Sequence, residues 1–370
     1  MLDSMRGKES NQQAMFSLLS PEKRVPAAHP LRGIKELVEQ ALTAMDGTFE
    51  AMYSRRGRSS IPPEQLLKSM LLMALFSVRS ERLFCEMLDY NLLYRWFLNM
   101  SMDEQSFHPT TFSKNRDRFL EHDISYELFA EVVRSAKNAD LLSDSHFTVD
   151  GTLIDAWASH KSFRPKDESP DERDTPDDPS NPDVDFRGQK RSNKTHASTT
   201  DPESRMARKS KGKEAKLSYS AHALMENRHG LLVDFRIDTA DGFAERLNAV
   251  SMLEDNVPGS QRLTLGADRG YDDRSFVDAC RARNITPHVA QKLDAPGGSA
   301  IDKRTTRHDG YRVSLRIRKQ VEEVFGWMKT VGGFRRTRLR GMARSQMAAY
   351  VVGAAYNLRR LVNIFACRSQ

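Results

Sequence analysis

The stretch HFTVDGTLIDAW, residues 146–157, marks the point at which the character of the chain changes. From Ile61 to about Leu142, apolar residues recur at helical spacing, which predicts a run of amphipathic helices. The stretch itself is rich in β-branched residues and predicts a strand or a tight pair of strands. We therefore expect an all-helical region followed by a region that contains a sheet.

The residues after this stretch predict a mixed sheet. A hairpin is expected first, in which LSYSAHALM and LLVDFRIDT are joined by the turn ENRHG, and strands then alternate with helices. Three antiparallel strands, followed by strands that alternate with helices, form the element order of a ribonuclease H-like core. The predicted fold class is mixed α/β: a ribonuclease H-like core with a central mixed β-sheet, preceded by an all-helical N-terminal domain.

Three regions follow from these changes of pattern. The first is polar, with loose ends and one helix expected near residues 33–45. An insertion between the first and second strands of the core has an acidic half and a basic half with almost no large apolar residues, which predicts a flexible segment. The predicted boundaries are 1–60 for the polar N-terminal segment, 61–142 for the helical domain, and 143–365 for the ribonuclease H-like domain with its insertion at 161–215.

The charge of the chain is unevenly spread. The formal net charge is +7, and Lys and Arg are dense between Lys303 and Arg344, where acids are few. This pattern favours binding to a polyanion, nucleic acid first, and a solvated basic face is the alternative.

Cysteine usage and apolar runs bear on the compartment. Cys85, Cys280 and Cys367 are far apart, which excludes a disulfide framework and a Cys-x-x-Cys zinc site and suits a reducing cytosol. The N-terminus has no apolar signal core, and the longest apolar run, Met70–Val78, is too short to span a bilayer. We expect a cytoplasmic protein without membrane association.

Glu322 and Glu323 are neighbours in the stretch RKQVEEVFGWMK, but a helical wheel separates them. At about 100° per residue, Glu322 stands at the edge of the apolar arc and shares a face with Arg318 and Lys329. Glu323 falls about 100° away, on the polar side, as an i−4 partner of Lys319. Glu322 is thus a carboxylate at the core boundary between two cations, and a simple ion pair is the alternative interpretation.

Two further carboxylates are placed to join Glu322. Asp150 lies in the first predicted strand and Asp268 directly after the fourth, and these strands are neighbours in a sheet of this order. Carboxylate oxygens suit Mg²⁺, and two such ions roughly 3.5–4 Å apart can activate a nucleophile and stabilise a leaving oxygen in phosphoryl transfer. A turn residue at Asp150 and a helix cap at Asp268 are the alternatives. Asp155 is excluded, because strand alternation puts it on the opposite face from Asp150.

The helical region contains a candidate DNA reader. In HPTTFSKNRDRFLEH, Thr110 or Thr111 is expected to cap a helix that exposes Lys114, Arg116 and Arg118. A capped helix of this kind after a turn is similar to a helix-turn-helix reader, and a bundle helix with a solvated face is the alternative.

Other chemistries find little support in the sequence. It contains no G-x-S-x-G, no P-loop and no dinucleotide-binding glycine pattern. His222 and His288, on predicted strands, are expected at the core edge or facing DNA rather than as metal ligands.

Four stretches together carry a family resemblance: VDGTLIDAW, KGKEAKLSYSAHALMENRHGLLVD, LGADRGYDD and VEEVFGWMKTVGGFRRTRLRG. In this order the chain resembles bacterial insertion-sequence transposases of the DDE class, of the insertion-sequence-five type. The resemblance implies a catalytic and metal-binding triad of Asp150, Asp268 and Glu322. Its signature of Tyr, Arg, Glu and Lys is matched at Arg318, Glu322 and Lys329. Leu315 occupies the Tyr position, and Tyr311, one turn earlier, is a partial substitute.

The resemblance also implies an activity. Such an enzyme cleaves DNA at the terminal inverted repeats of its element and joins the 3′ ends to target DNA, with two Mg²⁺ ions (or Mn²⁺ as a substitute) and as a dimer or higher homo-oligomer on double-stranded DNA. Other functions left open are a sequence-specific DNA-binding protein that no longer cuts and a structure-selective nuclease on the same fold.

DNA contacts are expected beside the triad. Arg318 and Lys329 would bind phosphate next to the metals. A cluster after the helix would follow the DNA backbone without a fixed register. Trp157 and Trp327 are candidates for stacking on an unpaired base, although core packing is the favoured role for Trp327. The arginines of the cluster are Arg335, Arg336, Arg338 and Arg340.

Overall fold

The structure is a computed structural model. It describes residues 20–53, 60–166, 192–209, 213–240, 244–256, 262–294 and 296–368.

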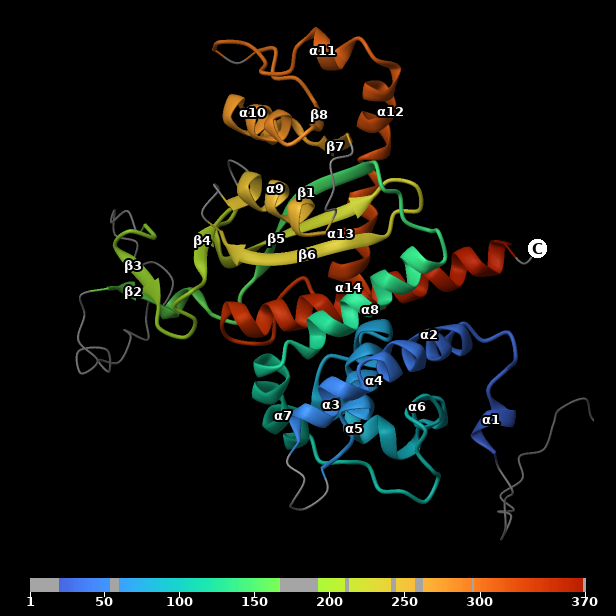
Figure 1. Ribbon diagram of the computed structural model, residues 1–370. Helices are drawn as coiled ribbons and strands as arrows, with labels where there is room; N and C mark the ends of the chain where they lie inside the picture. Colours follow the sequence, from blue (N-terminus) through green and yellow to red (C-terminus); the bar gives the residue numbers. More distant parts are fainter. Residues whose placement is uncertain are drawn as a thin grey trace, which may run out of the picture.

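A mixed sheet forms the centre of the C-terminal region (Figure 1). Its main strands are β1 (His146–Asp155), β5 (Lys216–Glu226), β6 (Leu232–Thr239), β7 (Leu263–Ala267) and β8 (Ile285–Val289). They lie in the order β6-β5-β1-β7-β8, in which β6, β5 and β1 are antiparallel and β1, β7 and β8 are parallel. The short strand β4 (Arg205–Ala207) pairs with the start of β5. This order confirms the predicted ribonuclease H-like core.

The two faces of the sheet belong to two hydrophobic cores. On one face, side chains such as Val149 and Leu224 pack with α9 (Ala244–Asn256), α10 (Arg274–Ala282) and α12 (Asp309–Ile317). On the other face, Ala223 and Phe235 pack with α13 (Gln320–Thr330) and α14 (Met342–Arg368). The alternation of side chains along each strand produces this division.

The helical region begins earlier than the sequence predicted. Its helices are α1 (Pro21–Arg24), α2 (Leu31–Ala44), α3 (Asp46–Met52), α4 (Pro63–Leu75), α5 (Glu81–Tyr90), α6 (Leu92–Phe97), α7 (Thr110–Glu121) and α8 (Ile124–Asn138). In α2, Leu31, Ile34, Val38 and Leu42 are buried in the same core as the later helices. The boundary at residue 60 is therefore corrected: a short apolar stripe in a polar context is enough to bury one helix face.

Helix α14 joins the helical region to the sheet. In Figure 1 it lies between β6 on one side and α8 and α4 on the other, and it packs against all three. Its buried residues belong to one core that runs from α2 to the sheet. Nowhere in the described part of the chain does a helix combine the length and apolar character needed to cross a membrane.

Two amides of α14 cover the outer edge of β6. Asn357 accepts from Leu232 N (2.9 Å) and donates to Leu232 O (2.8 Å). Gln346 accepts from Ile237 N (2.6 Å) and donates to Phe235 O (2.8 Å). The two amides are eleven residues apart, about three helical turns, so they share one face of α14. They satisfy backbone groups that an edge strand would otherwise leave unpaired.

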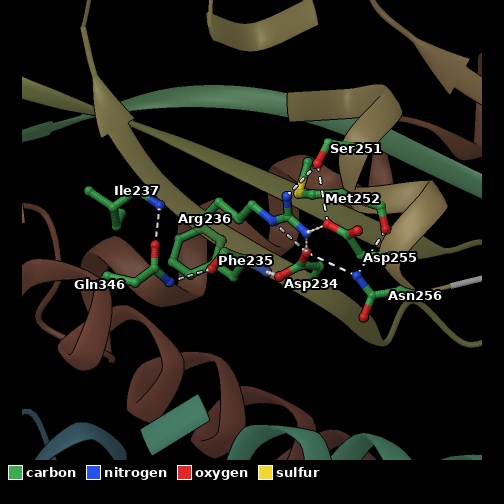
Figure 2. Close-up of polar contacts among 9 residues, drawn as sticks. All are labelled: Asp234, Phe235, Arg236, Ile237, Ser251, Met252, Asp255, Asn256 and Gln346. Atoms are coloured by element: carbon green, nitrogen blue, oxygen red, sulfur yellow. Dashed lines mark hydrogen bonds and ion pairs between the residues drawn. The ribbon is translucent and has the colours of Figure 1, made fainter. Parts of the chain in front are cut away.

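The intervening residues of β6 point to the opposite face, where α9 meets them (Figure 2). Arg236 donates to the buried Asp234 at 2.7 Å and to Asp255 at 2.6 Å, and it also bonds Ser251. Asn256 donates to Asp234 at 3.0 Å. This polar network fixes α9 against the hairpin.

The insertion is ordered at both of its ends, which corrects part of the prediction of a flexible segment. Strand β2 (Phe163–Pro165) pairs with β3 (His196–Ser198). Tyr219 in β5 donates to Asp201 at 2.6 Å, and both residues are buried. The acidic half, within 167–191, lies outside the described residues.

Candidate active site

The central strand β1 is longer than its neighbour β7. The edge of β1 after Thr148 is therefore not paired with β7. The parallel ladder between them ends at Thr148↔Gly266. Continued by two residues, the same register puts Asp150 across from Asp268. Pairing on this edge resumes at Asp155, which forms a bridge with Arg336. The two predicted aspartates thus face a gap between paired segments.

Local hydrogen bonds orient both aspartates. Asp150 Oδ1 accepts from the N–H of Gly151 at 2.8 Å. Asp268 caps a short 3₁₀ helix and accepts from Gly270 N at 2.7 Å. A Cβ on Gly270 would lie 2.8 Å from Asp268 Oδ1, so a side chain here would displace the Asp268 carboxylate from this hydrogen bond. Asp268 therefore does act as a helix cap, the alternative role given to it above, for the short 3₁₀ helix. Asp273 caps the following helix α10.

Two anchors place α13 alongside β1. Near its start, Arg318 Cβ lies 3.5 Å from where a Cβ on Gly266 would be, and Gly266 pairs with Thr148. Near its end, Lys329 Nζ donates to Thr152 Oγ1 at 2.6 Å. The helix therefore runs beside β1 from Thr148 to Thr152.

Between these anchors, Glu322 comes level with Asp150. Counted within α13, Glu322 is seven residues, or about 10 Å, before Lys329 at ~1.5 Å per residue. Along β1 that distance is about three residues before Thr152 at ~3.3 Å per residue, which is near Asp150. Glu322 and Lys329 are seven residues apart and share a face, and Lys329 turns that face toward β1. Glu322 and the adjacent Glu323 are both exposed.

Glu323 lies on a different side of α13. The pKa of the Tyr356 hydroxyl on α14 is raised, mainly by burial, and the Glu323 charge contributes to the rise. The Glu323 charge thus acts on a hydroxyl of α14, whereas the wheel placed this residue on the polar side as a partner of Lys319.

The three carboxylates lie on neighbouring elements but do not form a closed ligand set. Among the described residues, no three His, Cys, Asp or Glu side chains are grouped closely enough to hold a metal ion. Carboxylates that converge without a cation repel one another. The donor chemistry, oxygen ligands only, fits Mg²⁺ or Mn²⁺.

The residues from Asp309 to Thr330 form two helices, α12 and α13. At the junction, Lys319 N bonds Arg316 O at 3.4 Å and Val321 N bonds Arg318 O at 3.2 Å, a tighter spacing than an α-helix has. The wheel that assumed one helix from Arg318 onward is therefore wrong across this break. Arg318 keeps its place near β7, and its Nε is buried without a hydrogen-bond partner in the described chain.

Tyr311 does not substitute for the missing signature tyrosine. Its hydroxyl donates to Val289 O at 2.9 Å, and the ring lies edge-on to His288 at 5.7 Å. These contacts fix α12 on β8, and Leu315 packs against the same core. His288 is itself buried and bonds Ser314 Oγ at 2.7 Å, so it is a core residue rather than a DNA contact.

Lys329 lies in a cationic environment. Burial lowers the pKa of its ammonium, and the neighbouring Lys209 and Arg335 lower it further, while Asp155 opposes them. Lys209 belongs to the basic half of the insertion, and sequence reasoning did not select it. The positive charge of that half was the sequence feature that could have indicated Lys209 as a phosphate contact. Three cations at the end of β1 form a site suited to phosphate.

The arginines after α13 follow a fixed path, contrary to the prediction. Gly333 has a φ of +65° and turns the chain, and Phe334 N bonds Met328 O at 2.9 Å. Arg336 donates to Ala156 O (3.1 Å) and Ala158 O (3.2 Å). The pairing with Asp155 sets the register of this segment. Arg335, Arg338 and Arg340 are exposed along it.

The three cations of α7 do not form one exposed face. Arg116 pairs with Glu81 and its side chain is only 17% exposed. Arg118 donates to Asn115 at 2.9 Å and lies over the Tyr53 ring at 4.6 Å. Lys114 is exposed. The correction has a simple reason: residues two apart on a helix point about 200° away from each other.

The remaining predictions for α7 and the aromatic residues have clear outcomes. The residue before α7 is Pro109, and the His108 ring rather than a threonine accepts from Thr110 N, at 3.3 Å, so the prediction of a threonine cap is wrong. Trp327 packs edge-on against Tyr356 at 5.7 Å, which confirms core packing. His222 is fully buried in the sheet.

Family models match both halves of the chain. A model described as Transposase domain (DUF772) matches residues 19–118, and one described as Transposase DDE domain matches residues 142–358. No curated protein matches the chain.

Comparison with solved structures finds two kinds of transposase, both at low identity and low TM-score. One is the piggyBac transposase synaptic complex with hairpin DNA, with 11% identity, 92% of this chain and 76% of that chain covered, and a TM-score of 0.43. Another is the Mos1 transposase paired-end complex with left transposon end, with 12% identity, coverage of 77% and 83%, and a TM-score of 0.20. The order of the sheet, rather than these similarities, carries the fold assignment.

Proposed function

We propose a catalytic arrangement for this chain, which belongs to the Transposase DDE domain family. The protein is a DNA transposase, an enzyme that cleaves and transfers DNA strands. In this proposal Asp150, Asp268 and Glu322 hold two Mg²⁺ ions, for which Mn²⁺ is a substitute. It is supported by the end of the β1–β7 ladder two residues before Asp150 and Asp268, and by the contact of Lys329 in α13 with Thr152 in β1. The assignment to the insertion-sequence-five type stays a prediction.

The reaction is two displacements at phosphorus. In the first, a water oxygen bonds to the phosphorus at the end of the element and the bond to the 3′ oxygen breaks, which frees a 3′-hydroxyl. In the second, that hydroxyl bonds to a phosphorus of target DNA and displaces a 3′ oxygen there, so no ATP is needed. Bound divalent cations would supply activation of the nucleophile and stabilisation of the leaving oxygen.

The residues around the carboxylates position the DNA. Lys329, Lys209 and Arg335 hold a phosphate beside the cut, and Arg318 supplies a further cation at the start of α13. Exposed Arg340 continues the phosphate contacts sequence-independently. Terminal inverted repeats and target DNA are the substrates, with a dimer or higher oligomer on DNA. The helical region, with Lys114 exposed, is the proposed reader of the ends.

Alanine substitutions test the triad. Asp150→Ala, Asp268→Ala and Glu322→Ala are each expected to slow Mg²⁺-dependent cleavage of a plasmid carrying the repeats that flank the gene by about 1,000-fold or more, equivalent to ~4 kcal/mol. DNA affinity measured in EDTA should change little, because Lys and Arg carry binding.

Glu323→Ala is the matched control, since it removes the same charge from the adjacent residue. It should cleave at nearly the wild-type rate. Normal cleavage by Glu322→Ala, or loss of cleavage in Glu323→Ala, would overturn the assignment of the third carboxylate.

A further inference from the structure

A cavity of about 550 Å³ lies between the helical region and the segment that follows α13. Its apolar floor comes from α4, α14 and the turn after α13, with Met70, Met73, Phe334, Val351 and Val352 among the lining residues. The volume is in the range of small-ligand pockets. None of the catalytic roles proposed above uses this space.

Two arginines at the cavity lack an acidic partner. Arg79 follows α4, and Arg338 lies on the segment after α13. Burial lowers the pKa of Arg338, and the charge of Arg79, which lines the same cavity, lowers it further. Neither forms an ion pair within the described chain, whereas the nearby Arg116 is neutralised by Glu81. Two cations that line one cavity without an acidic partner favour the binding of an anion there.

The third feature of the cavity is a fixed, exposed indole. Trp157 is 45% exposed and lines the cavity. Arg336 lies over its ring at 5.1 Å and donates to the carbonyl oxygens of Ala156 and Ala158, the residues on either side of it. The guanidinium therefore holds both the backbone and the ring, and Arg336 is a positioning residue for Trp157.

The cavity is at the far end of β1 and α13, two of the three elements that place the triad. Trp157 follows β1, which bears Asp150, and Gly332 follows α13, which bears Glu322. From Glu322 to Gly332 the chain advances ten residues, which correspond to about 15 Å at ~1.5 Å per residue of helix. A DNA strand at ~3.4 Å per nucleotide covers that distance in about four or five nucleotides.

We propose that this cavity receives an unpaired nucleotide of the DNA strand that runs on past the cleavage site. Its phosphate lies between Arg79 and Arg338, and its base stacks on Trp157 above the apolar floor. Cationic groups beside an aromatic platform are the combination by which proteins bind single strands. The inference rests on the proposed function, since the strand must first occupy the site at Asp150.

The test compares two DNA probes on the full-length protein in EDTA at fixed low salt. One is a blunt fluorescein-labelled duplex, and the other is the same duplex with a six-nucleotide single-stranded thymidine overhang. A blunt duplex lengthened to the same number of phosphates controls for charge. We expect the wild-type protein to prefer the overhang by about tenfold.

Three variants should lose that preference and keep their affinity for the blunt duplex. They are Trp157→Ala, Ala348→Phe, and the double variant Arg79→Gln with Arg338→Gln. Ala348→Phe fills the cavity without altering charge, and the affinity of the double variant is corrected for the lost charge. The charge-matched control is Arg24→Gln with Arg359→Gln, two exposed arginines elsewhere, and it should retain the preference. Circular dichroism checks that each variant is folded.

The outcomes separate the two proposals. A wild-type protein without the preference, or Trp157→Ala and Ala348→Phe variants that keep it, would overturn the cavity assignment and leave the transposase mechanism standing. Failure to bind the blunt duplex at all would instead overturn the proposed DNA contacts, and the cavity assignment with them.

Discussion

At the residue scale, the position of Lys329 depends on one hydroxyl group. Its ammonium is partly buried, which lowers its pKa, and Thr152 Oγ1 accepts from it at 2.6 Å. A buried charge without such a partner is costly. Thr152 is two residues after Asp150 and on the same side of β1. The hydroxyl therefore holds the cation on the face of β1 that carries Asp150.

Substitution of Thr152 separates positioning from binding. Thr152→Val keeps the shape but removes the acceptor, and we expect the single-turnover cleavage rate to fall about 10- to 100-fold, because placement at the reacting phosphate is lost. DNA affinity should change less than about threefold. Thr152→Ser keeps the hydroxyl and should recover most of the rate. Equal rates for the Val and Ser variants would assign Thr152 a packing role only.

At the element scale, α12 is the support on which α13 and Glu322 depend. It is fixed to β8 by two side-chain contacts, Tyr311 to Val289 and Ser314 to His288. Burial, together with smaller contributions from the nearby His146 and His308, lowers the pKa of His288 to about 4. The folded protein therefore keeps this ring neutral at pH values at which the unfolded chain would protonate it.

The docking of α12 should weaken in mild acid. The unfolded ring takes up its proton near pH 6.5 and the folded one only near pH 4, so the unfolded state binds more protons between these values. The free energy of unfolding should fall as pH falls through this window, by ~2 kcal/mol between pH 7.5 and 5 from this group. Urea titrations at both pH values measure it.

The matched variant is His288→Gln, which cannot titrate. It should be less stable at pH 7.5 but should lose ~2 kcal/mol less than the wild type on acidification. An identical pH dependence in both proteins would show that His288 is accessible to protons in the folded state.

At the scale of the whole molecule, α14 makes the helical region and the sheet one cooperative body. It supplies buried residues to the core that both share, and its amides cover the edge of β6. The sequence boundary between a helical domain and a catalytic domain is thus a change of secondary structure, and not a break in the core.

Asn357→Ala should destabilise both regions together. It leaves the N–H and C=O of Leu232 buried without partners, at a cost of ~2–4 kcal/mol. In urea, the fluorescence of Trp96 in the helical region and of Trp327 near the sheet, each observed in a variant lacking the other tryptophans, should change at one lowered midpoint. Arg359→Ala, an exposed change on the same helix, should stay within ~0.5 kcal/mol. Two separate midpoints would contradict the single core.

Some features of this protein follow from local sequence alone. The change of period at His146, the order of the strands and the separation of Glu322 from Glu323 are all recorded in the spacing of apolar residues along single elements. Burial acts on one face of a helix or strand at a time, so it leaves this spacing in the sequence. For the same reason, the elements that carry Asp150, Asp268 and Glu322 were predictable.

Other features were decided only by tertiary structure, because they depend on residues that are distant in the chain. Thr152 meets Lys329, Glu81 neutralises Arg116, and Arg336 holds Trp157. The partner of a charged side chain is set by which elements pack together, and helical spacing carries no record of it. Thus Arg116 and Arg336 looked like free DNA contacts in the sequence. The cavity beside Trp157 was not visible there at all, since its walls come from segments that only folding brings together.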